Sequence, residues 1–292
     1  MSILLTAGTR AIVQGGPGRV GARQTEWMLR AGTRLVGAVT PGKGGTDLHG
    51  LPVYDSVAEA VERTGADASI LFVPAAGVRG AVLEAADAGV GLVVVIAEHV
   101  PVHDALEARE ACREAGCVMI GPNSPGIISP GIGKLGIMPA DAFAVGRLGM
   151  ISRSGTLAYE VAAVLQSMGM GVSTMIGIGG DPVLGTDMAD LVPRFVADPD
   201  TDALVVVGEI GGTQEERLAT LPELSSLPVC AFLAGYTAPF GRPMGHAGAV
   251  MSSAQGSAAR KAGVLERAGV RVAKSPRGLA EMLREAVERR TA

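Results

Sequence analysis

The chain has 292 residues, of which 48% are hydrophobic and 18% charged, and its formal net charge is −4. This length and composition predict about two folded domains and exclude a disordered chain. The sequence has no basic arm that would bind nucleic acid, and no apolar run of the roughly 18–20 residues that a membrane span needs. The N-terminal segment lacks the basic leader of a secretory signal. We therefore expect a cytoplasmic protein without nucleic-acid or membrane partners.

The cysteines and histidines are few and scattered. The spacing of Cys112, Cys117 and Cys230 fits neither a disulfide framework nor a metal site, and the four histidines do not cluster. This pattern predicts reduced thiols and no metal bound by this chain.

The first 122 residues alternate short apolar runs with helical patterns. We predict strands at 10–14, 34–39, 69–73, 92–97 and 118–120, and helices at 22–31, 57–64, 78–88 and 104–115. Several strand candidates are almost continuously apolar, as expected for strands that are buried on both faces. The alternation of strands and helices predicts a parallel, doubly wound sheet.

The pattern breaks at residues 121–145, which are rich in Gly and Pro and show no clean period. We predict irregular structure and a domain boundary there. A second series follows, with predicted strands at 150–152, 172–178, 203–209, 229–234 and 271–273, and helices at 157–168, 188–197, 214–221, 258–268 and 279–289. The predicted fold is therefore α/β, with two tandem doubly wound domains at residues 1–122 and 123–292.

A glycine-rich loop follows the first predicted strand, with Gly16, Gly18 and Gly21 in G-x-G-x-x-G spacing. Such a loop lets backbone N–H groups approach a phosphate at a helix N-terminus. An NAD site would also need an acidic residue after the second strand, whereas Lys43 stands there among glycines. The pair favours a phosphate-rich, nucleotide-containing ligand such as CoA. A tight turn without a ligand and a solvated Lys43 are the alternatives.

Candidate chemistry in the second half centres on His246, in the long Gly- and Pro-bearing loop 235–256. Its small neighbours leave the imidazole accessible to a phosphoryl donor. Glu209 ends an apolar strand and could accept a hydrogen bond from the other ring nitrogen. Ser154 and Gly155 begin a helix, where they could cap it or receive an anion. Taken alone, a histidine such as His246 is more often an ordinary surface-loop residue, and a serine such as Ser154 is more often a cap without an anion.

Six segments together resemble the alpha subunits of succinyl-CoA synthetase and the wider CoA-ligase superfamily, which includes malate–CoA ligase. The resemblance runs essentially from end to end of the chain. The segments are VTPGKGG (39–45), GPNSPGII (121–128), SRSGTLAYE (152–160), GIGGDP (177–182), GEIGG (208–212) and GHAGA (245–249).

The resemblance implies a Rossmann-type CoA-binding domain, a flavodoxin-like second domain and a role for each matching residue. His246 would be the phosphorylated histidine and Glu209 its supporting carboxylate, while Ser154 and Gly155 would receive the phosphate and Tyr159 would hold the carboxylate substrate. The residues implied in CoA binding are Pro17, Gly18, Arg19, Val20, Lys43, Ile96, Ala97 and Glu98.

The implied reaction needs a partner. Phosphate would pass from ATP or GTP to His246, then to a dicarboxylate, and the CoA thiol would attack the resulting acyl phosphate. The chain has no G-x-x-x-x-G-K-[ST] segment. The nucleotide and its Mg²⁺ are therefore expected on a beta subunit of ATP-grasp type.

Departures from the family pattern lie on the CoA side. Pro17 replaces a common Thr, Ser124 replaces a Cys, and Ala97 and His99 stand in a segment that commonly reads Ile-Thr-Glu-Gly. These changes keep a catalytically silent CoA-binding paralogue open as an alternative. Malate in place of succinate is a second alternative. Lys43 argues against an NAD-dependent dehydrogenase.

Overall fold

The computed structural model describes residues 2–242, 244–246, 248–251 and 256–291. The chain divides into two compact units. The N-terminal unit contains Leu4–Met138 and Val183–Thr186. The C-terminal unit contains Pro139–Pro182 and Asp187–Ala292, with the first three residues of the chain.

The N-terminal unit is a twisted α/β layer with an additional hairpin. Its strands are β1 (Ala11–Gln14), β2 (Leu35–Val39), β3 (Asp47–Leu48), β4 (Leu51–Tyr54), β5 (Ala68–Leu71), β6 (Leu92–Val95), β7 (Val118–Ile120), β8 (Gly126–Ser129) and β9 (Gly133–Gly136). Its helices are α1 (Arg19–Arg30), α2 (Val57–Thr64), α3 (Val78–Asp87) and α4 (Val102–Glu114).

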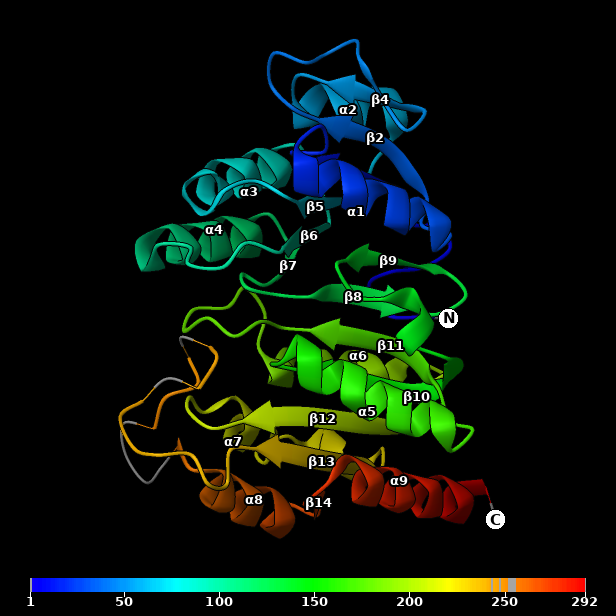
Figure 1. Ribbon diagram of the computed structural model, residues 1–292, viewed down its shortest axis with the longest axis vertical. Coiled ribbons are helices and arrows are strands. Elements are labelled where there is room, and N and C mark those ends of the chain that lie inside the picture. The colour runs from blue at the N-terminus through cyan, green and yellow to red at the C-terminus, as the bar shows by residue number, and fades with distance from the viewer. Residues whose placement is uncertain (1, 243, 247, 252–255, 292) are drawn as a thin grey trace. The chain divides into compact units, whose positions relative to one another are not determined.

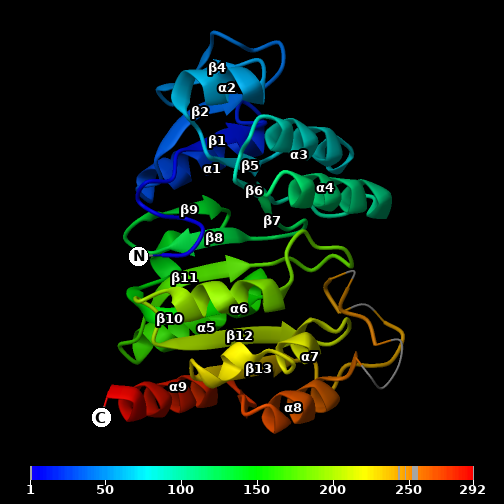
Figure 2. The same ribbon diagram turned by 180° about the vertical axis from the view of Figure 1, so that it is seen from behind.

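The strand order β3-β4-β2-β1-β5-β6-β7 places β1 between β2 and β5. All pairs in this order are parallel except the β3–β4 hairpin. Helices α2, α3 and α4 pack side by side, while α1 contacts β1 and β9 (Figure 2). Because the chain turns in opposite directions from β1 to β2 and from β4 to β5, a crevice opens beyond the carboxyl ends of β1, β2 and β5.

In its described residues, the C-terminal unit contains five parallel strands and five α-helices. Its strands are β10 (Val145–Ser152), β11 (Val172–Gly177), β12 (Ala203–Glu209), β13 (Val229–Ala234) and β14 (Arg271–Ala273). Its helices are α5 (Gly155–Ser167), α6 (Met188–Ala197), α7 (Gln214–Leu218), α8 (Ala258–Arg267) and α9 (Pro276–Thr291).

These strands run in the order β14-β13-β12-β10-β11, which is the flavodoxin-like order. Every residue of β12 is buried, because helices cover both faces of the sheet. Helices α5 and α9 contact each other, and α7 contacts both α6 and α8 (Figure 1). The chain order reverses between β10 and β12, so ligand sites are expected where these two strands end.

Most predicted elements are present, and four strands were missed. The Gly- and Pro-rich segment predicted to be irregular contains the antiparallel β8–β9 hairpin. The short β3–β4 hairpin was also missed. The division between the compact units falls after Met138 instead of after residue 122. Among the described residues, no helix is long and apolar enough to cross a membrane.

Candidate functional site

The ring of His246 faces the carboxylate of Glu209 at the end of β12. Nδ1 of His246 lies 3.0 Å from Oε1 and 3.1 Å from Oε2 of Glu209. The Glu209 side chain is 8% exposed, and that of His246 is 24% exposed. A carboxylate in this position accepts a hydrogen bond from Nδ1–H, which leaves Nε2 as the nitrogen with a free lone pair.

Charges around the ring set its protonation. The hydrogen bond with Glu209 raises the pKa of His246 above its ordinary value, although burial opposes this. The positive charge of Arg153 also lowers the pKa of His246, and the negative charge of Asp181 raises it. The carboxylate of Glu209 therefore stabilises the cationic form of the His246 ring.

The loops around His246 are held by backbone contacts. The N–H of Gly248 donates to the carbonyl of Gly180 at 3.0 Å, and the N–H of Ala249 donates to the carbonyl of His246 at 3.1 Å. Residue 247, which belongs to the GHAGA segment, lies outside the described residues. Gly180 packs against the ring itself, because a Cβ built there would lie 2.5 Å from Cγ of His246.

Three buried charged residues lie behind Glu209, and the sequence analysis missed all of them. Arg153 follows β10, Glu215 lies on α7 and Lys261 lies on α8. Their side chains are 4%, 0% and 0% exposed, respectively. Nη2 of Arg153 approaches Oε1 of Glu209 at 3.4 Å. In the sequence, Glu215 and Lys261 have the pattern of solvated helix residues. Arg153 could have been suggested only by the position of the SRSG segment at the end of a strand.

Ser154 and Gly155 lie where they were predicted, at the start of α5. The hydroxyl of Ser154 caps the helix and accepts from the N–H of Leu157 at 3.4 Å. The helix thus begins directly after Arg153 and directs its positive end toward the carboxyl ends of β10 and β12.

Tyr159 lies one helical turn further along α5. It makes an edge-on ring contact with Phe143, with the centroids 6.0 Å apart. Burial raises the pKa of its phenol, so the hydroxyl is neutral at pH 7. A role for Tyr159 in holding a carboxylate substrate stays a prediction.

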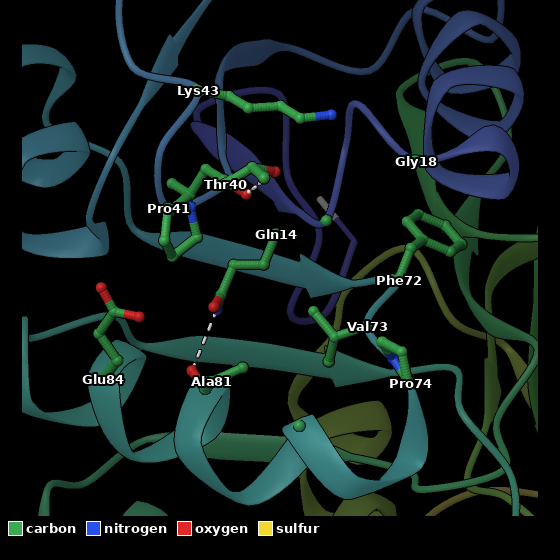
Figure 3. A pocket seen from close by; sticks show the side chains of 13 residues that line it. Gln14, Gly18, Thr40, Pro41, Lys43, Phe72, Val73, Pro74, Ala81 and Glu84 are labelled. Atoms are coloured by element: carbon green, nitrogen blue, oxygen red, sulfur yellow. Dashed lines mark hydrogen bonds between the residues drawn. The ribbon is translucent and has the colours of Figure 1, made fainter.

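A pocket of about 520 Å³ occupies the crevice of the N-terminal unit (Figure 3). Gln14, Gly15 and Gly18 line it from β1 and the glycine loop, and residues at the ends of β2 and β5 and on α3 complete the wall. Lys43 extends its ammonium group toward the side on which Gly18 lies. The pocket therefore combines an apolar wall with one cation and a glycine loop, as a phosphorylated nucleotide requires.

The polar wall of the pocket is fixed by internal hydrogen bonds. Nε2 of Gln14 donates to the hydroxyl of Ser69 at 3.0 Å and to the carbonyl of Ala81 at 3.1 Å. Oε1 of Glu84 accepts from the N–H of Val57 at 2.7 Å. Gly18 and Lys43 were predicted from the sequence, whereas Gln14 and Glu84 were missed. Gln14 is a lone polar residue in an apolar strand and Glu84 is a charged residue on helix α3, and neither pattern carries a ligand signal.

The remaining predicted CoA-binding residues lie outside the set that lines this pocket. Pro17, Arg19 and Val20 adjoin Gly18 at the start of α1, whereas Ile96, Ala97 and Glu98 follow β6. Their contact with CoA stays a prediction. In the part of the chain that the structure describes, no cluster of three His, Cys, Asp or Glu residues could hold a metal ion.

Comparisons with known proteins identify related chains and matching family models. A family model described as a CoA binding domain matches residues 6–99, and one described as CoA-ligase matches residues 151–275. A succinate–CoA ligase [ADP-forming] subunit alpha 2 from Archaeoglobus fulgidus is 50% identical over 285 residues, covering 98% of this chain and 99% of the relative. A malate–CoA ligase subunit alpha from Methylorubrum extorquens is 47% identical, covering 94% of this chain and 95% of the relative.

A solved structure supports the fold. An ATP citrate lyase from Methanothrix soehngenii, solved with citrate and coenzyme A, matches with a TM-score of 0.86 and 24% identity. That match covers 98% of this chain and 51% of the lyase chain, so this chain spans about half the length of that protein. Together with identities of about one half over nearly the whole sequence, these matches show that the chain belongs to the family of succinate–CoA ligase alpha subunits.

Proposed function

We propose that this chain is the alpha subunit of an acid–CoA ligase that forms succinyl-CoA from succinate and CoA through a phosphohistidine at His246. The contact between His246 and Glu209 carries the proposal, because it leaves Nε2 free and supports the charge that the ring gains on phosphorylation. The names of the related alpha subunits indicate succinate as the acid and CoA as the thiol.

In the first step, Nε2 of His246 attacks the γ-phosphorus of ATP. An N–P bond forms, the bond to the bridging oxygen breaks, and ADP leaves. The proton stays on Nδ1, where Glu209 accepts its hydrogen bond at 3.0 Å. The start of α5 at Ser154 and Gly155 would stabilise the phosphoryl group by its N–H groups and dipole.

In the later steps, a carboxylate oxygen of succinate attacks the phosphorus and releases neutral His246. The CoA thiolate then attacks the acyl phosphate, forms the thioester and expels inorganic phosphate. The pocket between β1, β2 and β5 would hold the nucleotide part of CoA, with Lys43 beside its phosphates. Tyr159 would contact the acid.

The nucleotide belongs on another chain in this scheme. The sequence has no Walker-type segment. We therefore infer a beta subunit of ATP-grasp type that binds ATP, or GTP, together with Mg²⁺. The ADP-forming activity in the relatives' names favours ATP. We also infer that the assembled enzyme works in the cytoplasm.

The test is co-expression with the beta subunit, followed by incubation with γ-labelled ATP. We expect a base-stable, acid-labile label on the His246 peptide, which succinate and CoA together discharge. His246→Asn should take up no label while its circular dichroism spectrum stays unchanged. A folded complex that never acquires the label would contradict the ligase function and favour a silent CoA-binding role.

Malate is the second candidate acid, because one relative of 47% identity is named a malate–CoA ligase subunit. The same labelled complex separates the two acids. The proposal expects succinate to discharge the label faster than malate at equal concentration. Faster discharge by malate would replace the substrate and leave the phosphohistidine chemistry intact.

A further inference from the structure

The proposed reaction uses His246 and Glu209, and it assigns no role to the charges buried behind them. We propose that Arg153, Glu215 and Lys261 form a positioning network that fixes the carboxylate of Glu209 and tunes the protonation of His246. This inference rests on the proposed function, because it gives the network a role in phosphoryl transfer.

Glu209 is held at two points by this network. Oε1 of Glu215 accepts a hydrogen bond from the backbone N–H of Glu209 at 3.0 Å. The same oxygen lies 3.4 Å from Nη1 of Arg153, and Nη2 of Arg153 lies 3.4 Å from the carboxylate of Glu209. Turning the Glu209 carboxylate away from His246 would break its contact with Arg153, while Glu215 holds the backbone from which that side chain extends.

Lys261 closes the network from α8. Its ammonium group contacts Oε2 of Glu215 and donates to the carbonyl of Gly211 at 2.7 Å. That carbonyl also accepts from Nη1 of Arg153 at 2.8 Å. Two cations from different elements thus converge on one backbone oxygen in the loop that follows Glu209. This convergence fixes the backbone as well as the side chains.

Stability alone is a weak account of these charges. Burying an ion costs several kcal/mol, and apolar residues of similar volume often stabilise a protein equally well or better. Burial by itself would raise the pKa of Glu215, yet the charges of Arg153 and Lys261 hold it below its usual value. Glu215 is therefore ionised, and its charge acts on Arg153 and, through Arg153, on Glu209.

The charge balance around the ring determines when His246 is a neutral nucleophile. Removing a cation from the network leaves its carboxylates in excess, which favours the protonated ring; removing a carboxylate has the opposite effect. The charged groups that face His246 or stand behind it are Glu209 from β12, Arg153 after β10, Asp181 after β11, Glu215 and Glu216 from α7, and Lys261 from α8.

Two single variants of the full chain test the network, because they change its charge in opposite directions. Lys261→Met should raise the pH at which His246 loses its proton, and Glu215→Gln should lower it. The titration is followed by NMR of the imidazole nitrogens in the chain alone. In the complex with the beta subunit, the pH at half-maximal labelling of His246 should move in the same directions.

The double variant Glu215→Gln/Lys261→Met should return both pH profiles toward the wild-type position, because the charge balance is restored. A role in packing alone would lower thermal stability in all three variants without opposite shifts. The matched controls are Lys274→Met and Glu281→Gln, both at exposed positions of the same unit. They should leave the profiles in place.

Profiles that stay at the wild-type pH in folded variants, or that shift the same way in both single variants, would overturn the inference. If Lys261→Met does not fold, two results still test the inference. Glu215→Gln should lower the pH at which His246 loses its proton, and the double variant Glu215→Gln/Lys261→Met should reverse that shift. The two proposals fail separately. Opposite NMR shifts without any labelling of the wild-type complex would support the network and contradict the ligase function.

Discussion

In the proposed reaction, the side chain of His246 carries the phosphoryl group, and its neighbours determine whether the ring is neutral or protonated. The pKa of this ring is raised, first by its hydrogen bond with Glu209. The protonated ring therefore stabilises the fold below the unfolded-state pKa of about 6.5, and this contribution disappears as the pH rises through the folded value. Reactivity runs the other way, because only the neutral ring has a free lone pair.

Replacing Glu209 separates these two effects. Glu209→Gln removes the negative charge but keeps an acceptor, so the pKa of His246 should fall. The rise of labelling with pH should then occur at lower pH. The maximal rate should also fall, because a neutral amide supports the charged phosphohistidine less well. NMR titration and initial labelling rates measure both effects. An unchanged His246 titration in the folded variant would refute the assigned role of Glu209.

Gly180 makes room for the ring, which gives a second residue-level prediction. A Cβ at this position would lie 2.5 Å from Cγ and 2.7 Å from Nδ1 of His246. Gly180→Ala should therefore push the ring off Glu209 and slow labelling by roughly 10²-fold, the usual consequence of a misplaced reacting group.

The matched control is Gly263→Ala on α8, where the nearest side-chain atom lies 3.5 Å from the new methyl group. This variant should keep its labelling rate and gain roughly 0.5–1 kcal/mol of stability, since Ala favours a helix interior. Labelling of Gly180→Ala at the wild-type rate would show that the ring need not stay against Glu209.

The sequence predicted the contact of His246 with Glu209, and the structure brings the two together. The sequence allowed this prediction because a strand end and a glycine-bordered loop can be recognised from local patterns, and because both segments resemble those of a known family. The burial of Glu215 and Lys261 could not be predicted, because a charged residue in a helix normally faces solvent. These two residues are buried in the fold, where α7 and α8 contact each other, and Arg153 is buried in the turn after β10.

At the level of elements, the buried parallel strands were the most predictable part. Apolar runs such as β12 and β13 begin and end at the predicted residues, since burial on both faces leaves a continuous hydrophobic signal. The β8–β9 hairpin was missed, because β8 begins with a glycine and β9 begins and ends with one, which leaves too few side chains to show an alternating pattern. The local pattern of hydrophobic residues does not predict a strand where close pairing of glycine backbones takes the place of side-chain packing.

The turn between β1 and α1 depends on close packing that can be tested. A Cβ at Gly21 would lie 2.3 Å from the carbonyl oxygen of Gly15, in the loop that lines the pocket. Gly21→Ala should therefore displace α1 and weaken CoA binding by about tenfold or more, equivalent to at least about 1.4 kcal/mol. Isothermal calorimetry with CoA measures the change.

The control for this loop is Gly80→Ala on α3, where a new methyl group meets no atom within 4 Å. Its affinity for CoA should equal that of the wild type. Equal affinity in Gly21→Ala, with its fold intact, would mean that CoA does not use the glycine loop.

At the level of the whole molecule, the two units divide the proposed reaction. The pocket proposed for the CoA nucleotide lies in the N-terminal unit, and His246, the proposed phosphohistidine, lies in the C-terminal unit. The sequence predicted two doubly wound domains but placed their boundary after residue 122. The hairpin up to Met138 belongs to the first unit by its contacts, and contacts between distant residues are not visible in a local pattern.

This division predicts that CoA stabilises the isolated chain without any partner subunit or nucleotide. Ligand at about 100 times its Kd should add about 2.7 kcal/mol to the free energy of unfolding, which thermal melts detect as a higher Tm. Lys43 faces the pocket and is exposed, so its attraction to the phosphates of CoA should weaken as salt screens the two charges.

Replacing Lys43 tests this contact. Lys43→Met should show a smaller rise in Tm with CoA, and its affinity for CoA should depend less on salt concentration, whereas Lys274→Met should behave like the wild type. A chain that binds CoA with the same affinity and salt dependence after Lys43→Met would place the phosphates elsewhere. Because binding needs no histidine chemistry, this outcome would leave the assignment of His246 untouched.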